Sequence, residues 1–235
     1  MKTEESGSPI AGIVARLRCF PLLLLALLGG CASLPERPPV ENPSATWQTR
    51  QTQLAQLNVW DLRGRLALRA DEQGANASLR WVRDRDRHRM NLAGPFGGGH
   101  VRLTYDGSGA ELRDSDGETY HGATMQQLLL RATGWNLPIE GLNYWVLGLP
   151  DPAAPAQSTL DEWGRLKLLE QLGWDVEFIE YTQAGRYELP RRVFIRHKQR
   201  DASDSEIEAR LVIETWEVHN YAAKKIAQQR RLFPR

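Results

Sequence analysis

The sequence has few cysteines and almost no excess charge. Only two cysteines occur in 235 residues, Cys19 and Cys31, so a domain formed by the rest of the chain has no disulfide framework. Thirty basic residues stand against 29 acidic ones, which gives a formal net charge of +1. A chain with so little net charge has no long-range field that would recruit nucleic acid. We therefore expect no nucleic-acid partner.

The sequence also lacks the patterns of common enzyme sites. Its histidines show no HExxH or other close metal-ligand spacing: His88, His100, His121, His197 and His219. The glycine-rich stretch "GPFGGGH" has no Gly-Lys-Ser/Thr and stands between strand-like segments, and no Gly-x-Ser-x-Gly elbow occurs. We predict that the protein is not an enzyme and that it binds no metal and no cofactor.

A long hydrophobic run is missing as well. The longest apolar run near the N-terminus, "FPLLLLALLGG" at residues 20–30, is about half of the ~20 residues that a membrane-spanning helix needs. Arg16 and Arg18 precede it, an arrangement typical of a signal peptide. We predict that residues 1–30 are a signal peptide.

The next stretch, "LLGGCAS", resembles a bacterial lipobox, with Leu28 three places before Cys31 and two glycines between them. The resemblance implies cleavage before Cys31, a diacylglycerol on its sulfur and an acyl chain on its amino group, although a short membrane anchor with an incidental cysteine remains an alternative. Two or more acyl chains hold a protein stably on a membrane. Ala32 follows in place of Asp, which by the sorting rule of enteric-type lipoproteins implies a lipid-anchored protein of the outer membrane that faces the periplasm.

A short tether and a helix are expected next. Residues 31–44 include "SLPERPPVENPS", whose four prolines favour a stiff, extended tether. Ser44 is then expected to cap a helix in which Trp47, Leu54 and Leu57 recur near helical spacing.

Most of the remaining chain is typical of β-strands. In "WDLRGRLALRA", Leu62, Leu66 and Leu68 alternate with arginines around Gly64, and turn dipeptides such as Asp106-Gly107 separate later runs. The last strand is expected to place these residues on one face: Ile207, Ala209, Leu211, Ile213 and Thr215. The run "RWVRDRDRHR" is interpreted as a charged hairpin turn, with a basic rim facing an acidic carrier as the alternative.

Two apolar helices interrupt the strands. We expect one in "ATMQQLLLRATG", ended by Gly134, and one in "LNYWVLGLPDP", ended by Gly148 and Pro150. About ten short strands with helices inserted between two sets indicate a mainly β fold. The sequence pattern leaves open a curved antiparallel sheet or an incomplete barrel, with the helices against its open side.

Three segments together carry a resemblance to a known family. They are the lipobox, "NLAGPFGGGHVRL" and "TGWNLPIEGLNYWVLGLP". On these segments, the chain resembles the LolB family of outer-membrane lipoprotein receptors from Cys31 to about Val218. The resemblance implies an incomplete, half-open antiparallel β-barrel of about ten or eleven strands with an α-helical lid over an apolar cavity. It places this domain at residues 45–218 and leaves 219–235 as a basic C-terminal tail.

The same resemblance implies a function and its partners. A LolB-like protein would accept lipoproteins from the periplasmic carrier LolA and insert them into the inner leaflet of the outer membrane without nucleotide. The acyl chains of a client lipoprotein would fill the cavity, because leaving ~40 methylenes in water costs on the order of 30 kcal/mol at about 0.8 kcal/mol each. We expect a monomer. The alternative is a structural or assembly lipoprotein that binds proteins without holding lipid.

Two sets of site residues follow from the resemblance. Phe96 is expected at the tip of a membrane-insertion loop that contains Pro95, Gly97, Gly98 and Gly99; a ring folded back into the core is the alternative. Candidates for the cavity wall or its lid are Trp81, Leu128, Leu129, Leu142, Trp145, Val146, Trp174 and Trp216. Ordinary core packing is the alternative for each of these.

Overall fold

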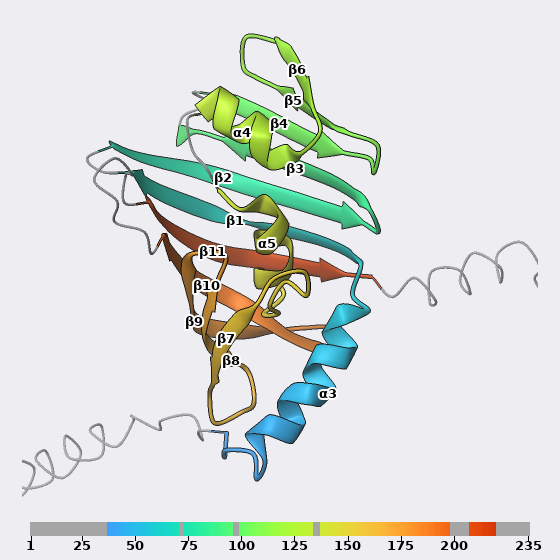
Figure 1. Ribbon diagram of the computed structural model, residues 1–235, viewed down its shortest axis with the longest axis vertical. Coiled ribbons are helices and arrows are strands. Elements are labelled where there is room, and N and C mark those ends of the chain that lie inside the picture. Colours follow the sequence, from blue (N-terminus) through green and yellow to red (C-terminus); the bar gives the residue numbers. More distant parts are fainter. Residues whose placement is uncertain (1–36, 71–72, 96–98, 134–136, 198–206, 220–235) are drawn as a thin grey trace, which may run out of the picture. The chain divides into compact units, whose positions relative to one another are not determined.

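The computed structural model describes residues 37–70, 73–95, 99–133, 137–197 and 207–219 (Figure 1). From Val40 onward the chain forms one compact unit. The predicted signal peptide, Cys31 and most of the predicted tether lie outside the described residues, as do Phe96, Gly97 and Gly98 and nearly all of the basic tail.

One open antiparallel sheet of 11 strands forms the body of this unit, in the order β6-β5-β4-β3-β2-β1-β11-β10-β9-β8-β7. The prediction of a mainly β, antiparallel fold with ten or eleven strands is confirmed, and the sheet is not closed into a barrel. The strands are β1 (Val59–Ala70), β2 (Gln73–Asp84), β3 (Arg87–Ala93), β4 (His100–Tyr105), β5 (Ala110–Arg113), β6 (Thr119–Gly122), β7 (Ala156–Leu160), β8 (Leu166–Gln171), β9 (Trp174–Ala184), β10 (Tyr187–His197) and β11 (Ile207–Val218).

Nearly all neighbouring strands follow one another in sequence. Gly107 and Gly117 adopt φ values of +95° and +86° in the β4–β5 and β5–β6 turns, which glycine reaches at little steric cost. The predicted charged turn joins β2 to β3, where Arg85 has a φ of 59°. The strand β7 was missed by the sequence analysis, because "AQSTL" at this sheet edge has no apolar alternation.

The exception is the pairing of β1 with β11, which joins the two halves of the sheet. A β-bulge at Glu214 interrupts it, because Arg63 pairs with Thr215 whereas Gly64 pairs with Ile213. The prediction that Thr215 shares the apolar face is therefore wrong: Thr215 is exposed, and Trp216 instead packs edge-on against Trp60.

Gly64 explains how the two strands come so close. A Cβ atom at this position would lie 2.1 Å from the carbonyl oxygen of Val212. Any other residue would therefore push β1 away from β11.

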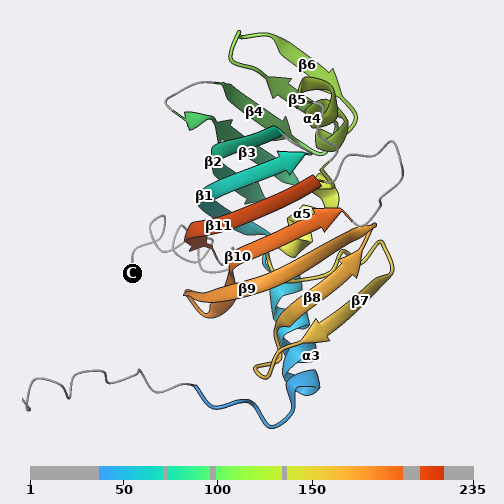
Figure 2. The same cartoon turned by 90° about the vertical axis from the view of Figure 1, so that its left-hand side faces the viewer.

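In the part of the chain that the structure describes, three helices lie on the same face of the sheet, as two perpendicular views show (Figures 1 and 2). They are α3 (Pro43–Ala55), α4 (Met125–Thr133) and α5 (Ile139–Trp145). Ser44 was predicted to cap α3, but the cap is Asn42, whose side chain accepts a hydrogen bond from the Ala45 N–H at 2.9 Å. Pro43 is then the first helical residue, where proline is favoured because its missing N–H would have no helical partner. In the described part of the chain, every helix falls short of the length and apolar character needed to cross a bilayer.

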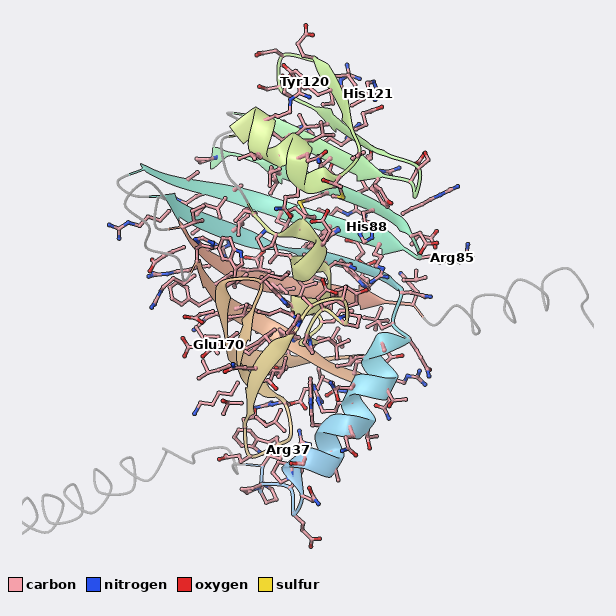
Figure 3. The ribbon with its side chains drawn as sticks, viewed as in Figure 1. Arg37, Arg85, His88, Tyr120, His121 and Glu170 are labelled. Atoms are coloured by element: carbon pink, nitrogen blue, oxygen red, sulfur yellow. The ribbon has the colours of Figure 1, made fainter. Side chains whose placement is uncertain are left out.

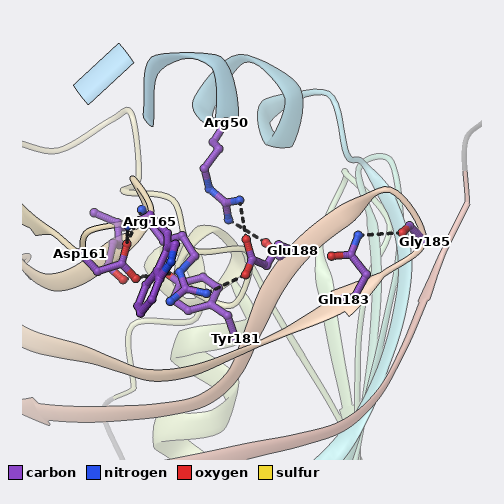
Figure 4. Close-up of polar contacts among 9 residues, drawn as sticks. Arg50, Asp161, Arg165, Tyr181, Gln183, Gly185 and Glu188 are labelled. Carbon is purple, nitrogen blue, oxygen red and sulfur yellow. Dashed lines mark hydrogen bonds and ion pairs between the residues drawn. The ribbon is translucent and has the colours of Figure 1, made fainter. Parts of the chain in front are cut away.

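A partly buried ionic cluster fastens α3 to the sheet (Figure 4). The Glu188 carboxylate accepts from Arg165 Nη1 at 2.6 Å and from Arg50 Nη1 at 3.4 Å, and Arg50 Nη2 donates to the Glu188 carbonyl oxygen at 2.7 Å. Arg165 also donates from Nε to Asp161 at 2.7 Å. Its guanidinium lies 4.5 Å from the ring centroid of Tyr181, which favours attraction to the ring face.

Candidate functional site

An apolar cavity lies between the sheet and the helices α4 and α5. Among the described residues, every side chain that lines it is apolar, which suits hydrocarbon rather than polar ligands. The sheet contributes Leu66, Leu68, Leu79, Trp81, Met90, Leu92, Ile195, Ala209 and Leu211, and the helical side contributes Leu129, Leu137, Pro138, Ile139, Leu142 and Val146.

The cavity is nearly closed in this structure. Its volume is about 40 Å³, well below the ~150 Å³ of an engineered protein cavity that binds benzene. A ligand as large as an acyl chain would fit only if α4, α5 or both moved away from the sheet.

The C-terminal end of α5 is anchored by buried hydrogen bonds. Trp145 donates from its indole nitrogen to Gln171 Oε1 at 2.9 Å, and the Asp151 N–H donates to the same oxygen at 2.8 Å. Gln171 Nε2 donates in turn to the carbonyl oxygens of Asp151 and Ala154. Because a buried polar group left without a partner costs about 1–3 kcal/mol, this network fixes one end of α5.

The predicted stop of this helix is also present. Gly148 has a φ of +73°. Its N–H donates to the Trp145 carbonyl oxygen, and the Leu149 N–H donates to that of Tyr144. This pair of bonds is the Schellman pattern that ends many helices at a glycine.

Packing against the sheet holds α4. Met125, Leu128 and Leu129 are buried, whereas Leu130 is 41% exposed on the outer side of the helix. Leu128 lies over Gly122 of β6, where an added Cβ would come within 3.0 Å of the leucine side chain. Apolar contacts have no fixed direction, so other apolar groups could replace them.

A second depression, of more mixed polarity, adjoins the cavity. It has a volume of about 400 Å³ and shares two lining side chains with the cavity, Trp81 and Ile139. Its other lining residues are His88, Tyr105, Ala123, Thr124, Met125, Glu140, Asn143, Tyr144, Asp151 and Ala153. Figure 3 shows His88 on the side of the sheet that the helices cover.

His88 and Trp81 form a hydrogen-bonded pair at the border between cavity and depression. The Trp81 indole N–H donates to His88 Nδ1 at 3.3 Å. Burial lowers the pKa of His88 to about 4, and the positive charge of Arg83 acts in the same direction. The imidazole is therefore neutral near pH 7, and because Nδ1 accepts a hydrogen bond its proton is on Nε2.

The structure divides the predicted cavity residues into three groups. Trp81, Leu129, Leu142 and Val146 line the cavity. Leu128 and Trp145 are buried on the lid helices without lining it. Trp174 and Trp216 lie elsewhere: Trp174 packs against His197 with ring centroids 4.8 Å apart, and Trp216 donates from its indole nitrogen to the Pro190 carbonyl oxygen.

The predicted membrane loop is described only at its two ends. Pro95 and Gly99 are both exposed, and Gly99 has a φ of +69°. The Gly94 N–H donates to the Gly99 carbonyl oxygen at 2.9 Å, so the loop leaves and re-enters the sheet at one point between β3 and β4. The position of the Phe96 ring stays a prediction.

Several residues of the site were not singled out from the sequence. The alternation of Leu66 and Leu68 with arginines predicted only that the two share one face of a strand. Pairing of β1 with β11 then brings Ala209 and Leu211 beside them, which local patterns do not reveal. No sequence signal distinguished Asn143 and Tyr144 from other helix residues.

Comparison with known proteins gives one consistent family. The family model "Outer membrane lipoprotein LolB" matches residues 58–216. An outer-membrane lipoprotein LolB from Nitrosococcus oceani is 35% identical over 198 residues, covering 84% of this chain and 95% of the relative. Another from Pseudomonas savastanoi pv. phaseolicola is 36% identical over 196 residues, covering 83% and 92%. A solved LolA superfamily protein from Nitrosomonas europaea has a TM-score of 0.46 at 7% identity, covering 76% of this chain and 96% of that one.

Proposed function

Because this chain belongs to the LolB family of outer-membrane lipoproteins, we propose that it is a lipid-anchored receptor that accepts lipoproteins and inserts them into the outer membrane. The family is one of lipoprotein-binding receptors, not of enzymes. In this proposal Cys31 carries the S-diacylglycerol and an N-acyl chain, and the folded domain faces the periplasm. The immediate donor of clients is a LolA-type carrier.

The observation that carries the proposal is the wholly apolar cavity beneath α4 and α5. The acyl chains of a client need such a surface, since exposing ~40 methylenes to water costs on the order of 30 kcal/mol. At about 40 Å³ the cavity is too small for acyl chains, so in this proposal the helices move away from the sheet when a client is accepted. Opening replaces contacts between helix and sheet by contacts with acyl chains, which keeps the cost of opening low.

Transfer then needs only an order of affinities. The receptor must hold acyl chains more tightly than the carrier does and less tightly than the bilayer does. Each step is then downhill, and no nucleotide is required.

A transfer experiment tests this proposal. The full chain with Cys31→Ala is mixed, without ATP, with a LolA-type carrier loaded with a labelled lipoprotein, and the two complexes are separated. We expect the label to move to the receptor. Label that stays on the carrier at an excess of receptor would contradict the proposal.

The small volume of the cavity also fits a second candidate function, that of an assembly lipoprotein that binds proteins without holding lipid. Such a protein would not bind a fluorescent fatty acid in its interior. A receptor with an opening lid would bind the fatty acid and protect it from quenchers in solution. The same purified protein serves for both measurements.

A further inference from the structure

The depression beside the apolar cavity matches the polar part of an acylated cysteine. Such a client is an amphiphile: its hydrocarbon chains join a glyceryl and cysteinyl group through ester and amide carbonyls. The two neighbouring spaces differ in polarity in the same way. The cavity is lined by apolar side chains, whereas the depression is also lined by histidine, tyrosine and asparagine. Trp81 and Ile139 belong to both linings, so a ligand that passes these two side chains contacts both spaces.

Three side chains of the depression can donate hydrogen bonds to a ligand, those of His88, Asn143 and Tyr144. Because His88 Nδ1 accepts from Trp81, the imidazole offers its Nε2–H. The Asn143 Oδ1 accepts from Arg83 Nη1 at 3.2 Å, which leaves the Asn143 amide N–H groups as donors. Tyr144 adds a hydroxyl group. Ester carbonyl oxygens only accept hydrogen bonds, so this set of donors suits them.

Two carboxylates also line the depression, and neither conflicts with this assignment. Asp151 is buried and accepts a hydrogen bond from the Ala153 N–H at 2.9 Å. Glu140 is exposed on α5. Glu140 can accept hydrogen bonds from the backbone N–H groups of the first residues of a client.

We propose that the depression binds the glyceryl and cysteinyl part of an acylated client, with His88, Asn143 and Tyr144 donating hydrogen bonds to its carbonyl oxygens while the acyl chains enter the cavity. This inference rests on the proposed receptor function and adds a polar subsite to it. The subsite gives the receptor a means to distinguish lipoproteins from other molecules with acyl or alkyl chains. Selection by such donors is effective because a donor covered by a ligand that offers no acceptor loses its hydrogen bond to water.

A pair of ligands isolates the contribution of the carbonyl groups. One is a synthetic lipopeptide whose N-terminal cysteine carries an S-diacylglycerol and an N-acyl chain. The other is the same molecule with ether links in place of the two glyceryl esters. Both are titrated against the full chain with Cys31→Ala, by displacement of a fluorescent fatty acid. We expect about fivefold tighter binding of the ester form, which corresponds to one net hydrogen bond.

Substitution of His88 then tests the assignment. His88→Phe should reduce the preference for the ester form, because only the donors of Asn143 and Tyr144 remain, whereas His88→Gln, which keeps an amide donor, should retain more of it. The matched control is His121→Phe, because His121 is exposed on β6 and lies away from His88 (Figure 3); this variant should keep the full difference.

The possible results separate the subsite from the function. If His88→Phe keeps the full preference for esters, or if the unsubstituted protein shows none, the subsite is wrong although the receptor function stands. If neither lipopeptide displaces the fatty acid from any variant, the receptor function itself is wrong. The affinity of each variant for the plain fatty acid reports whether its cavity is intact.

Discussion

Trp81 and His88 form a hydrogen-bonded pair at the border between the apolar cavity and the depression. The Trp81 side chain is 2% exposed, and its N–H finds a partner in His88 at 3.3 Å. The arrangement serves two purposes, because it satisfies a buried indole N–H and fixes the tautomer of the imidazole. The neutral form of His88 is required for both, since a protonated imidazole has no acceptor to offer.

This requirement predicts a pH dependence of stability. In the unfolded chain His88 takes up a proton near pH 6.5, whereas in the folded protein its lowered pKa delays protonation to about 4. The unfolded state therefore binds more protons between these values, and stability falls as the pH drops from about 6.5 to about 4 and levels off below. The loss amounts to about 3 kcal/mol over the window.

Urea unfolding at several pH values between 7 and 4 measures this loss. The difference in unfolding free energy between the unsubstituted protein and His88→Phe should shrink as the pH falls, because the variant lacks the titrating group. Asp86 and Arg83, whose charges act on His88 in opposite directions, are the same in both proteins. A difference that stays constant with pH would show that His88 is not held neutral by the fold.

At the scale of elements, the attachment of α3 depends on one carboxylate. Glu188 contacts two guanidinium groups, those of Arg50 and Arg165, and the three side chains are only 15–18% exposed. Glu188→Ala leaves two largely buried cations without their common partner, so we expect a loss of about 3 kcal/mol in unfolding free energy. Urea unfolding measures it, and hydrogen exchange should show faster opening of α3.

The neighbouring strand offers a matched control. Glu180 on β9 also contacts two arginines, Arg191 at 2.6 Å and Arg192 at 3.5 Å, but these side chains are 35–52% exposed. Glu180→Ala should therefore cost less than about 1 kcal/mol. Equal losses for the two substitutions would contradict the role assigned to burial.

The sequence predicts some of the helices and strands correctly and misses others. Strands with a buried and an exposed face were found from their alternation, as in Leu62, Leu66 and Leu68, and turn glycines separated them correctly. β7 was missed because its face is polar and its edge position needs no apolar pattern. The helix cap was misplaced because Asn42 and Ser44 are both good caps, and only Asn42 leaves Pro43 at the start of the helix.

The candidate site was predictable only in part, for a similar reason. Apolar residues of α4 and α5 were identified from helical spacing and family resemblance, and Leu129, Leu142 and Val146 do line the cavity. The other lining residues depend on pairing between strands far apart in sequence. β1 pairs with β11, the last strand along the chain, and a bulge at Glu214 turns Thr215 outward. The polar depression depends on contacts among β2, β3, α4 and α5 and leaves no local pattern.

At the scale of the whole molecule, acceptance and delivery of a client place opposite demands on the protein. Acceptance needs a cavity that excludes water, and the lining beneath α4 and α5 provides it. Delivery needs the acyl chains to leave that cavity beside a bilayer instead of in water. An apolar residue between β3 and β4 that entered the bilayer would bring the cavity next to the membrane.

The last prediction separates these two steps. Phe96→Glu should leave folding and acceptance of clients unchanged, because the Gly94–Gly99 hydrogen bond closes the base of the loop and neither of these two residues lines the cavity. Delivery to liposomes should fall by about tenfold or more, since a phenylalanine ring buried in the bilayer interface contributes roughly 2 kcal/mol. Phe96→Leu is the control and should deliver normally, because it keeps an apolar side chain at the tip. The measurement counts labelled client in floated liposomes against client left on the receptor, and normal delivery by Phe96→Glu would show that membrane contact lies elsewhere.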